Sequence, residues 1–129
     1  MRLLLDTHIL LWTLLTPGRL PSAARDALAD DANDTVVSAA SVWEIAIKHA
    51  LGRLNVPVDR LDELIAELGC TLLPITLPHA IAAGALPRLH NDPFDRMLIA
   101  QARHEALTLV TADVTLRRYD VAILSAARI

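Results

Sequence analysis

Short apolar runs that alternate with segments of helical pattern constrain the fold of this chain more than any other feature. The runs are too short and too continuous for amphipathic helices, and their length suits buried strands. Five strands are therefore expected, in RLLL (2–5), TVVS (35–38), CTLLPI (70–75), LTLVT (107–111) and YDVAIL (119–124). Strands that alternate with helices predict an α/β fold with a parallel sheet and right-handed crossovers.

The segments between these runs carry helix start and stop signals. Thr7, Ser38 and Asp59 are expected N-caps, and Pro17-Gly18, Gly52 and Gly69 are expected stops. The first expected helix ends at about Leu15, and the others cover residues 21–32, 39–51, 60–68, 76–86 and 94–106. No linker or repeat interrupts the series, so we expect a single domain over 1–129, a three-layer α/β/α sandwich.

The composition narrows the class of protein. A hydrophobic fraction of 53% exceeds the usual ~45–50%, which indicates that a partner or a second copy covers some apolar surface. The apolar start is interrupted by Asp6 and His8, and Ile9 to Leu15 is too short to span a bilayer, so a cytoplasmic protein is expected. One cysteine, Cys70, excludes an internal disulfide and a multi-cysteine zinc site, and its apolar surroundings favour an inert core thiol.

The charge balance restricts how nucleic acid would be bound. A formal charge of −3 argues against binding through a large positive field. A nuclease remains compatible with it, because four carboxylates at a metal site would leave −3 + 4 = +1 elsewhere. All but one of the basic residues are arginines, which suit bidentate phosphate contacts, although any single one is more simply explained as a solvated helix residue.

Acidic residues follow the expected strands at the edge where open α/β sheets bind ligands. Asp6 follows the first strand and Asp113 the fourth, while Asp95 lies in the first turn of a helix whose start faces the same edge. Each has a simpler reading as a turn or cap residue. Together, however, carboxylates at one edge would repel one another and raise their pKa values, and a bound divalent cation resolves this conflict.

Glu44 lies in the helix that follows the second strand, between apolar residues that cover most of the helix circumference. A partly enclosed carboxylate needs a partner, and Lys48 at i+4 or a metal ion would serve.

The stretch HNDPFDRMLIAQA (90–102) combines two roles. Asp92 before Pro93 reads as an N-cap, and Asp95 is favoured near a helix N-terminus by the helix dipole. We expect Asp92 to act mainly as the cap, with a possible contact to the metal site, and Asp95 to be a metal ligand.

An oxygen-rich site of this kind predicts Mg²⁺ or Mn²⁺ as the cofactor. The five histidines do not have zinc-site spacing, and we expect surface or hydrogen-bonded core roles for His8, His49, His79, His90 and His104. A metal-activated water that attacks a phosphodiester is the corresponding chemistry.

These motifs resemble the PIN-domain ribonucleases, specifically the VapC-type toxins of type II toxin–antitoxin systems. The similarity covers nearly the whole chain, in LLLDTHILLW, VVSAASVWEIAIKHALGRL, HNDPFDRMLIAQA and LTLVTAD. The resemblance implies a metal-dependent endoribonuclease, an antitoxin protein that occupies the active-site groove, an RNA substrate and a homodimer.

The resemblance also assigns residues. The family's catalytic and metal-binding acidic quartet falls on Asp6, Glu44, Asp95 and Asp113, and the neighbouring polar positions fall on Thr7, Asp92 and Thr111. Asn91 stands where similar sequences often carry a basic residue, which leaves Arg96 as the candidate phosphate contact.

Two other functions fit parts of the pattern. Asp6 could be the nucleophile of an aspartyl phosphotransferase, but His8 stands where a second aspartate would be expected. A dimeric interaction module whose acidic residues only cap helices would show no dependence on metal ions.

Overall fold

The computed structural model describes residues 1–127 and contains one parallel sheet of five strands in the order β3-β2-β1-β4-β5. The strands are β1 (Arg2–Leu5), β2 (Asp34–Ser38), β3 (Thr71–Leu73), β4 (Thr108–Thr111) and β5 (Ile123–Ser125). β1 lies in the centre and pairs with β2 on one side and β4 on the other. The expected parallel α/β fold is therefore confirmed.

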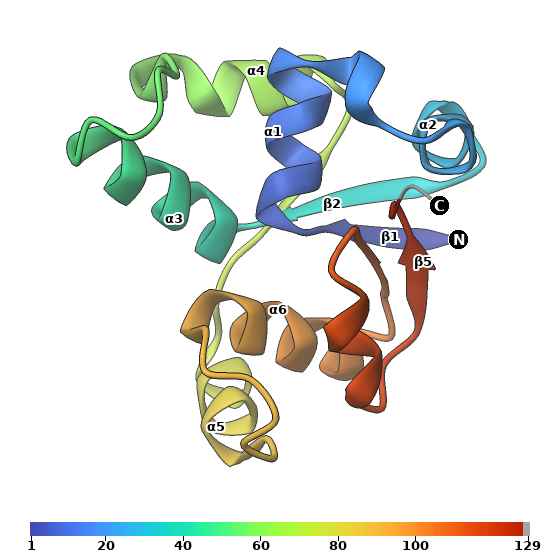
Figure 1. Cartoon of the computed structure of the whole chain (residues 1–129), viewed down its shortest axis with the longest axis vertical. Coiled ribbons are helices and arrows are strands. Elements are labelled where there is room, and N and C mark those ends of the chain that lie inside the picture. Colours follow the sequence, from blue (N-terminus) through green and yellow to red (C-terminus); the bar gives the residue numbers. More distant parts are fainter. Residues whose placement is uncertain (128–129) are drawn as a thin grey trace.

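Two layers of helices cover the two faces of this sheet (Figure 1). One layer contains α1 (Thr7–Leu15), α2 (Ser22–Ala29), α3 (Ala39–Ala50) and α4 (Leu61–Glu67). The other contains α5 (Leu77–Ala85), α6 (Pro93–His104) and the 3-10 helix η3 (Val114–Arg118). Two further short 3-10 helices, η1 (Pro17–Arg19) and η2 (Val58–Arg60), lie in the connections.

The two cores follow from the alternation of side chains along β1. Leu3 and Leu5 point into the core beneath α1 and α4, whereas Leu4 points into the core beneath α6. All three side chains are buried. A strand buried on both faces needs apolar residues at every position, which is why the sequence shows an uninterrupted run.

Several expected boundaries are wrong. Asp59 does not cap a helix, because it lies inside η2 and α4 starts at Leu61 without a side-chain cap. Thr7 is the first residue of α1, and Asp6 is its N-cap. The third strand is shorter than expected, as Pro74 follows it without an N–H to donate.

The fifth strand starts later than expected, at Ile123. Tyr119 is the C-cap of η3, and the amide of Val121 donates to its carbonyl in a turn, so this part of the apolar run is not extended.

A buried polar network joins the two helical layers. Ser38 caps α3 by accepting from the amide of Ala40 and donates to Oε1 of Gln101 on α6 over 2.5 Å. Gln101 contacts Nδ1 of His79, which also accepts from the amide of Thr76. The expectation of a hydrogen-bonded core histidine is confirmed at His79, whose side chain is fully buried.

The longest helices, α3 and α6, have 12 residues each, and none of the helices within residues 1–127 is long and apolar enough to cross a membrane.

Candidate metal centre

Asp6 lies at the carboxyl end of the central strand β1, between the half of the sheet that contains β2 and β3 and the half that contains β4 and β5. Its Oδ1 accepts from the amide of Ile9 at 2.9 Å, and its Oδ2 accepts from the hydroxyl of Thr111. The side chain is 5% exposed, and this burial raises the pKa of the Asp6 carboxyl above its ordinary value. The carboxylate is therefore fixed in position and electrostatically favours a cation.

Glu44 reaches the same edge from the second turn of α3 and is buried, as its apolar neighbours predicted. Thr7 donates to its Oε1 over 2.6 Å, and Nζ of Lys48 lies 3.0 Å from its Oε2. The expected i+4 ion pair with Lys48 is present, so each oxygen of Glu44 has a partner.

Asp95 occupies the first turn of α6, directly after the cap. Asp92 accepts from the amides of Phe94 and Asp95 through Oδ1, which confirms its role as the N-cap. The Oδ2 of Asp95 lies 2.7 Å from Nε2 of His90. Burial raises the pKa of Asp95 to about 6, and the charges of Asp92 and Asp6 act in the same direction.

Asp113 follows β4 and caps η3, so the simple turn reading from the sequence is also correct for this residue. Its Oδ1 accepts from the hydroxyl and the amide of Thr115, and the hydroxyl bond in particular lowers the pKa of Asp113. The Thr111 hydroxyl accepts from the Asp113 amide while it donates to Asp6, and it thereby links the two aspartates.

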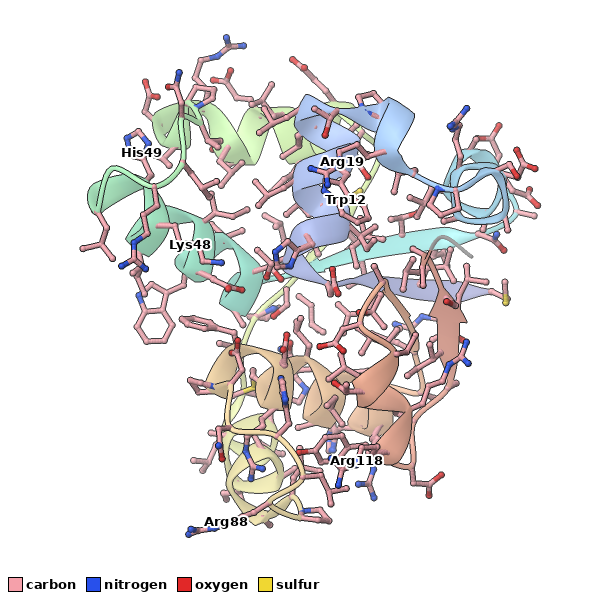
Figure 2. All side chains as sticks on the ribbon, in the orientation of Figure 1. Trp12, Arg19, Lys48, His49, Arg88 and Arg118 are labelled. Carbon is pink, nitrogen blue, oxygen red and sulfur yellow. The ribbon has the colours of Figure 1, made fainter. Side chains whose placement is uncertain are left out.

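All four expected acidic ligands line one cavity of about 330 Å³. The cavity is lined by Asp6, Thr7, His8, Trp12, Glu44, Lys48, Asp92, Asp95, Ala112 and Asp113. Figure 2 shows Trp12 and Lys48 on the neighbouring helices α1 and α3. Thr111 does not line the cavity, but its hydroxyl donates to the carboxylate of Asp6.

The donor set fits a divalent cation that prefers oxygen. Asp6 is buried and Asp95 is partly buried, and both carboxyls have raised pKa values, which a bound cation would lower. Ligand atoms of His90, Asp95 and Asp113 all lie within 4.8 Å of one another. An ion held there would have a mixture of carboxylate and imidazole donors within reach.

The hydrogen bonds of Arg96 do not support its expected role as a phosphate contact. Its two terminal nitrogens donate to four carbonyl oxygens, those of Ala83, Leu86, Pro87 and His90. The guanidinium therefore holds the end of α5 and the loop before α6, and it is not directed at the cavity.

Sequence reasoning missed His90, His8 and Trp12 as residues of this region. His90 precedes Asp95 by five residues, and the Asn-Asp-Pro turn between them brings the two side chains together. His8 and Trp12 are four residues apart on α1, and this spacing after a candidate ligand at Asp6 was the available signal. Cys70, expected as a core thiol, is only half-buried, and burial raises its pKa.

Comparison with known proteins gives matches along most of the chain. The family model of the PIN domain matches residues 3–122. Ribonuclease VapC22 of Mycobacterium tuberculosis is 35% identical over 119 residues, which is 90% of each chain.

Solved structures match the fold at lower sequence identity. The DNA-bound VapBC of Salmonella typhimurium matches with a TM-score of 0.70 and 16% identity, over 98% of this chain and 99% of that one. The VapBC2 of Rickettsia felis, bound to a promoter fragment, matches with a TM-score of 0.68 and 17% identity, over 97% and 98%. These two likenesses show a shared fold.

Proposed function

The chain belongs to the PIN domain family, and from this premise we propose that it is a divalent-metal-dependent endoribonuclease, the toxin of a toxin–antitoxin pair. The observation that carries the proposal is the convergence of four carboxylates, Asp6, Glu44, Asp95 and Asp113, in one cavity. These residues come from four separate parts of the chain, so helix capping alone does not account for their meeting. A relative that covers nine-tenths of the chain and is named a ribonuclease supports the same reaction.

A bound Mg²⁺ or Mn²⁺ would supply the Lewis acid that activates water and stabilises charge on the phosphoryl oxygens. In this proposal Asp6, Glu44, Asp95 and Asp113 hold the cation. Thr111 fixes the orientation of Asp6, and Thr7 does the same for Glu44. Lys48 offsets the charge of Glu44 and faces the space where an RNA phosphate would lie.

We also propose a protein antitoxin that covers this cavity, a homodimeric assembly and action in the cytoplasm. The two VapBC structures with this fold are bound to DNA, and their names join VapC with a VapB partner. The high apolar content of the chain agrees with a surface that a partner covers.

A phosphotransferase with Asp6 as nucleophile is disfavoured by the contacts of that residue. Both of its carboxylate oxygens accept hydrogen bonds from within the protein, and the side chain is 5% exposed. So little exposed surface restricts the in-line approach of a phosphoryl group more than it restricts the binding of a small cation.

One test is cleavage of RNA by the purified protein with Mn²⁺ or Mg²⁺. A second test is the mapping of RNA fragment ends after brief induction of the protein in cells. Wild-type protein should give defined ends, while Asp6→Asn and Asp95→Asn should give none and should relieve the growth defect. The matched control is Asp62→Asn, because Asp62 is an exposed aspartate on α4 that does not line the cavity. This variant should cleave like wild type. Intact RNA with wild-type protein and either metal would refute the proposal.

A further inference from the structure

We propose that His90 is a nitrogen ligand of the catalytic cation, and that it makes the site prefer Mn²⁺, or another transition-metal ion, over Mg²⁺. The inference rests on the proposed metal-dependent function and adds a ligand of a different chemical type to the four carboxylates.

The His90 ring lies close to two of the carboxylates. Its Nε2 lies 2.7 Å from Oδ2 of Asp95, and the ligand atoms of His90, Asp95 and Asp113 all lie within 4.8 Å of one another. Oxygen and nitrogen ligands bind such ions at about 2.0–2.2 Å, so donors on opposite sides of one ion are about 4 Å apart. Small side-chain adjustments would therefore close this set around an ion.

The other nitrogen of the His90 ring faces solvent. Within residues 1–127, Nδ1 of His90 has no hydrogen-bond partner, and the side chain is 27% exposed. The neutral ring can therefore carry its proton on Nδ1, toward water, and leave the lone pair of Nε2 for an ion.

A second group of possible ligands in the fold lacks this freedom. His79, His104 and Glu105 also lie close together. However, Nδ1 of His79 accepts from the amide of Thr76, which places the proton of the neutral ring on Nε2, facing Glu105. That group is a closed hydrogen-bond network, whereas the group at His90 is open.

The backbone that carries His90 is held in place. NH1 of Arg96 donates to the carbonyls of His90 and Pro87, and NH2 donates to those of Ala83 and Leu86. Asp92 caps the helix two residues later. A ligand on a fixed segment loses less conformational freedom on binding, which favours a functional contact over a chance one.

The expected consequence is a change in metal preference. Imidazole nitrogen suits transition metals, whereas Mg²⁺ prefers carboxylate and water oxygens. Replacing His90 with glutamine should weaken Mn²⁺ binding by at least about tenfold and change Mg²⁺ binding much less.

The decisive experiment is pulsed electron paramagnetic resonance of Mn²⁺ bound to the full chain. The wild-type protein should show the modulation of a directly bound ¹⁴N, which should change on labelling histidine with ¹⁵N. His90→Gln should lose the nitrogen signal and keep Mn²⁺ binding of lower affinity. The matched control is His8→Gln, since His8 is the histidine that lines the cavity of the four carboxylates, and this variant should keep the signal.

Each other outcome overturns the inference. Bound Mn²⁺ without a nitrogen signal in wild type, or loss of the signal in His8→Gln only, would exclude His90 as the ligand. Those results would leave the proposed ribonuclease intact, provided that RNA is cleaved. Failure of wild-type protein to bind Mn²⁺ at all would refute the metal site itself. If His90→Gln folds poorly, the isotope-labelled wild type still shows whether a histidine binds the ion, and His8→Gln shows whether that histidine is His8.

Discussion

Asp92 and Asp95 differ in what their carboxylates contact, although only two residues separate them. Asp92 accepts from two amides at the start of α6, which is the ordinary work of an N-cap. Asp95 is paired with a histidine side chain, and burial raises its pKa to about 6. The same helix start thus supplies one carboxylate that caps the helix and one with a raised pKa.

Asp95→Asn is predicted to stabilise the metal-free protein at pH 7. The ordinary aspartate pKa is 3.8, and the pKa of Asp95 in the folded protein is about 6. The protonated carboxyl therefore stabilises the folded state, and this contribution is complete below pH 3.8. This contribution is lost as the pH rises through about 6. Removing the charge should therefore raise the free energy of unfolding by about 2–3 kcal/mol at neutral pH.

Urea denaturation in the presence of a chelator measures this difference. The gain from Asp95→Asn should shrink as the pH is lowered from 7 toward 4. A gain that is independent of pH, or a loss of stability at pH 7, would contradict the proposed cause.

Asp92→Ala is predicted to lower the free energy of unfolding by about 1 kcal/mol, because two amides lose their acceptor. Asp92→Asn should restore this stability, since asparagine is an equally good cap, and should keep RNA cleavage. A stable Asp92→Asn protein without activity would show that the charge of Asp92 also serves the metal site.

At the scale of elements, the loop between α5 and α6 depends on one arginine. The side chain of Arg96 donates to four carbonyls of this segment, which lies between an apolar helix and the cap of α6. A guanidinium suits these pairs of carbonyls, because it is planar and carries several N–H donors in a fixed arrangement. The sequence does not reveal these hydrogen bonds, because an arginine at this position could equally donate to a phosphate or to backbone carbonyls.

Arg96→Gln is predicted to destabilise the protein by roughly 2 kcal/mol, because charge-assisted hydrogen bonds are lost and carbonyls are left without partners. Hydrogen exchange should become faster over residues 86–92, and Mn²⁺ affinity should fall with it. Arg103→Gln is the matched control, as Arg103 is an exposed arginine on the same helix. Equal effects of the two substitutions would show that the carbonyl contacts do not matter.

At the scale of the whole molecule, the sequence predicts the sheet, its two helical layers and the edge that carries the acidic residues. This works because buried parallel strands read as unbroken apolar runs, as in Leu3 to Leu5, and because strand ends and helix starts share an edge. The caps expected at Thr7 and Asp59 are wrong, since Asp6 and Thr7 have equal claims as a cap and η2 carries no signal that separates it from α4.

The role of His90 was not predictable for a different reason. Its contact with Asp95 depends on the turn through Asn91 and Pro93, whose geometry is set by the Arg96 contacts and by packing of α5 against α6. Contacts of this kind arise from tertiary structure, and local spacing gives no measure of them.

A bound cation is predicted to stabilise the whole fold. A cation that binds only the folded chain raises its stability according to concentration, by about 2.7 kcal/mol at a hundred times the dissociation constant. Because the cation competes with protons for Asp6 and Asp95, whose pKa values are raised by burial, this gain should be small at pH 5 and full above about pH 7. Thermal melting with millimolar Mn²⁺ or with chelator, at several pH values, measures it. The Asp6→Asn protein should lose the gain in stability at every pH, whereas Asp62→Asn should keep it. A melting temperature of the wild-type protein that does not depend on metal would mean that the acidic residues act as helix caps only.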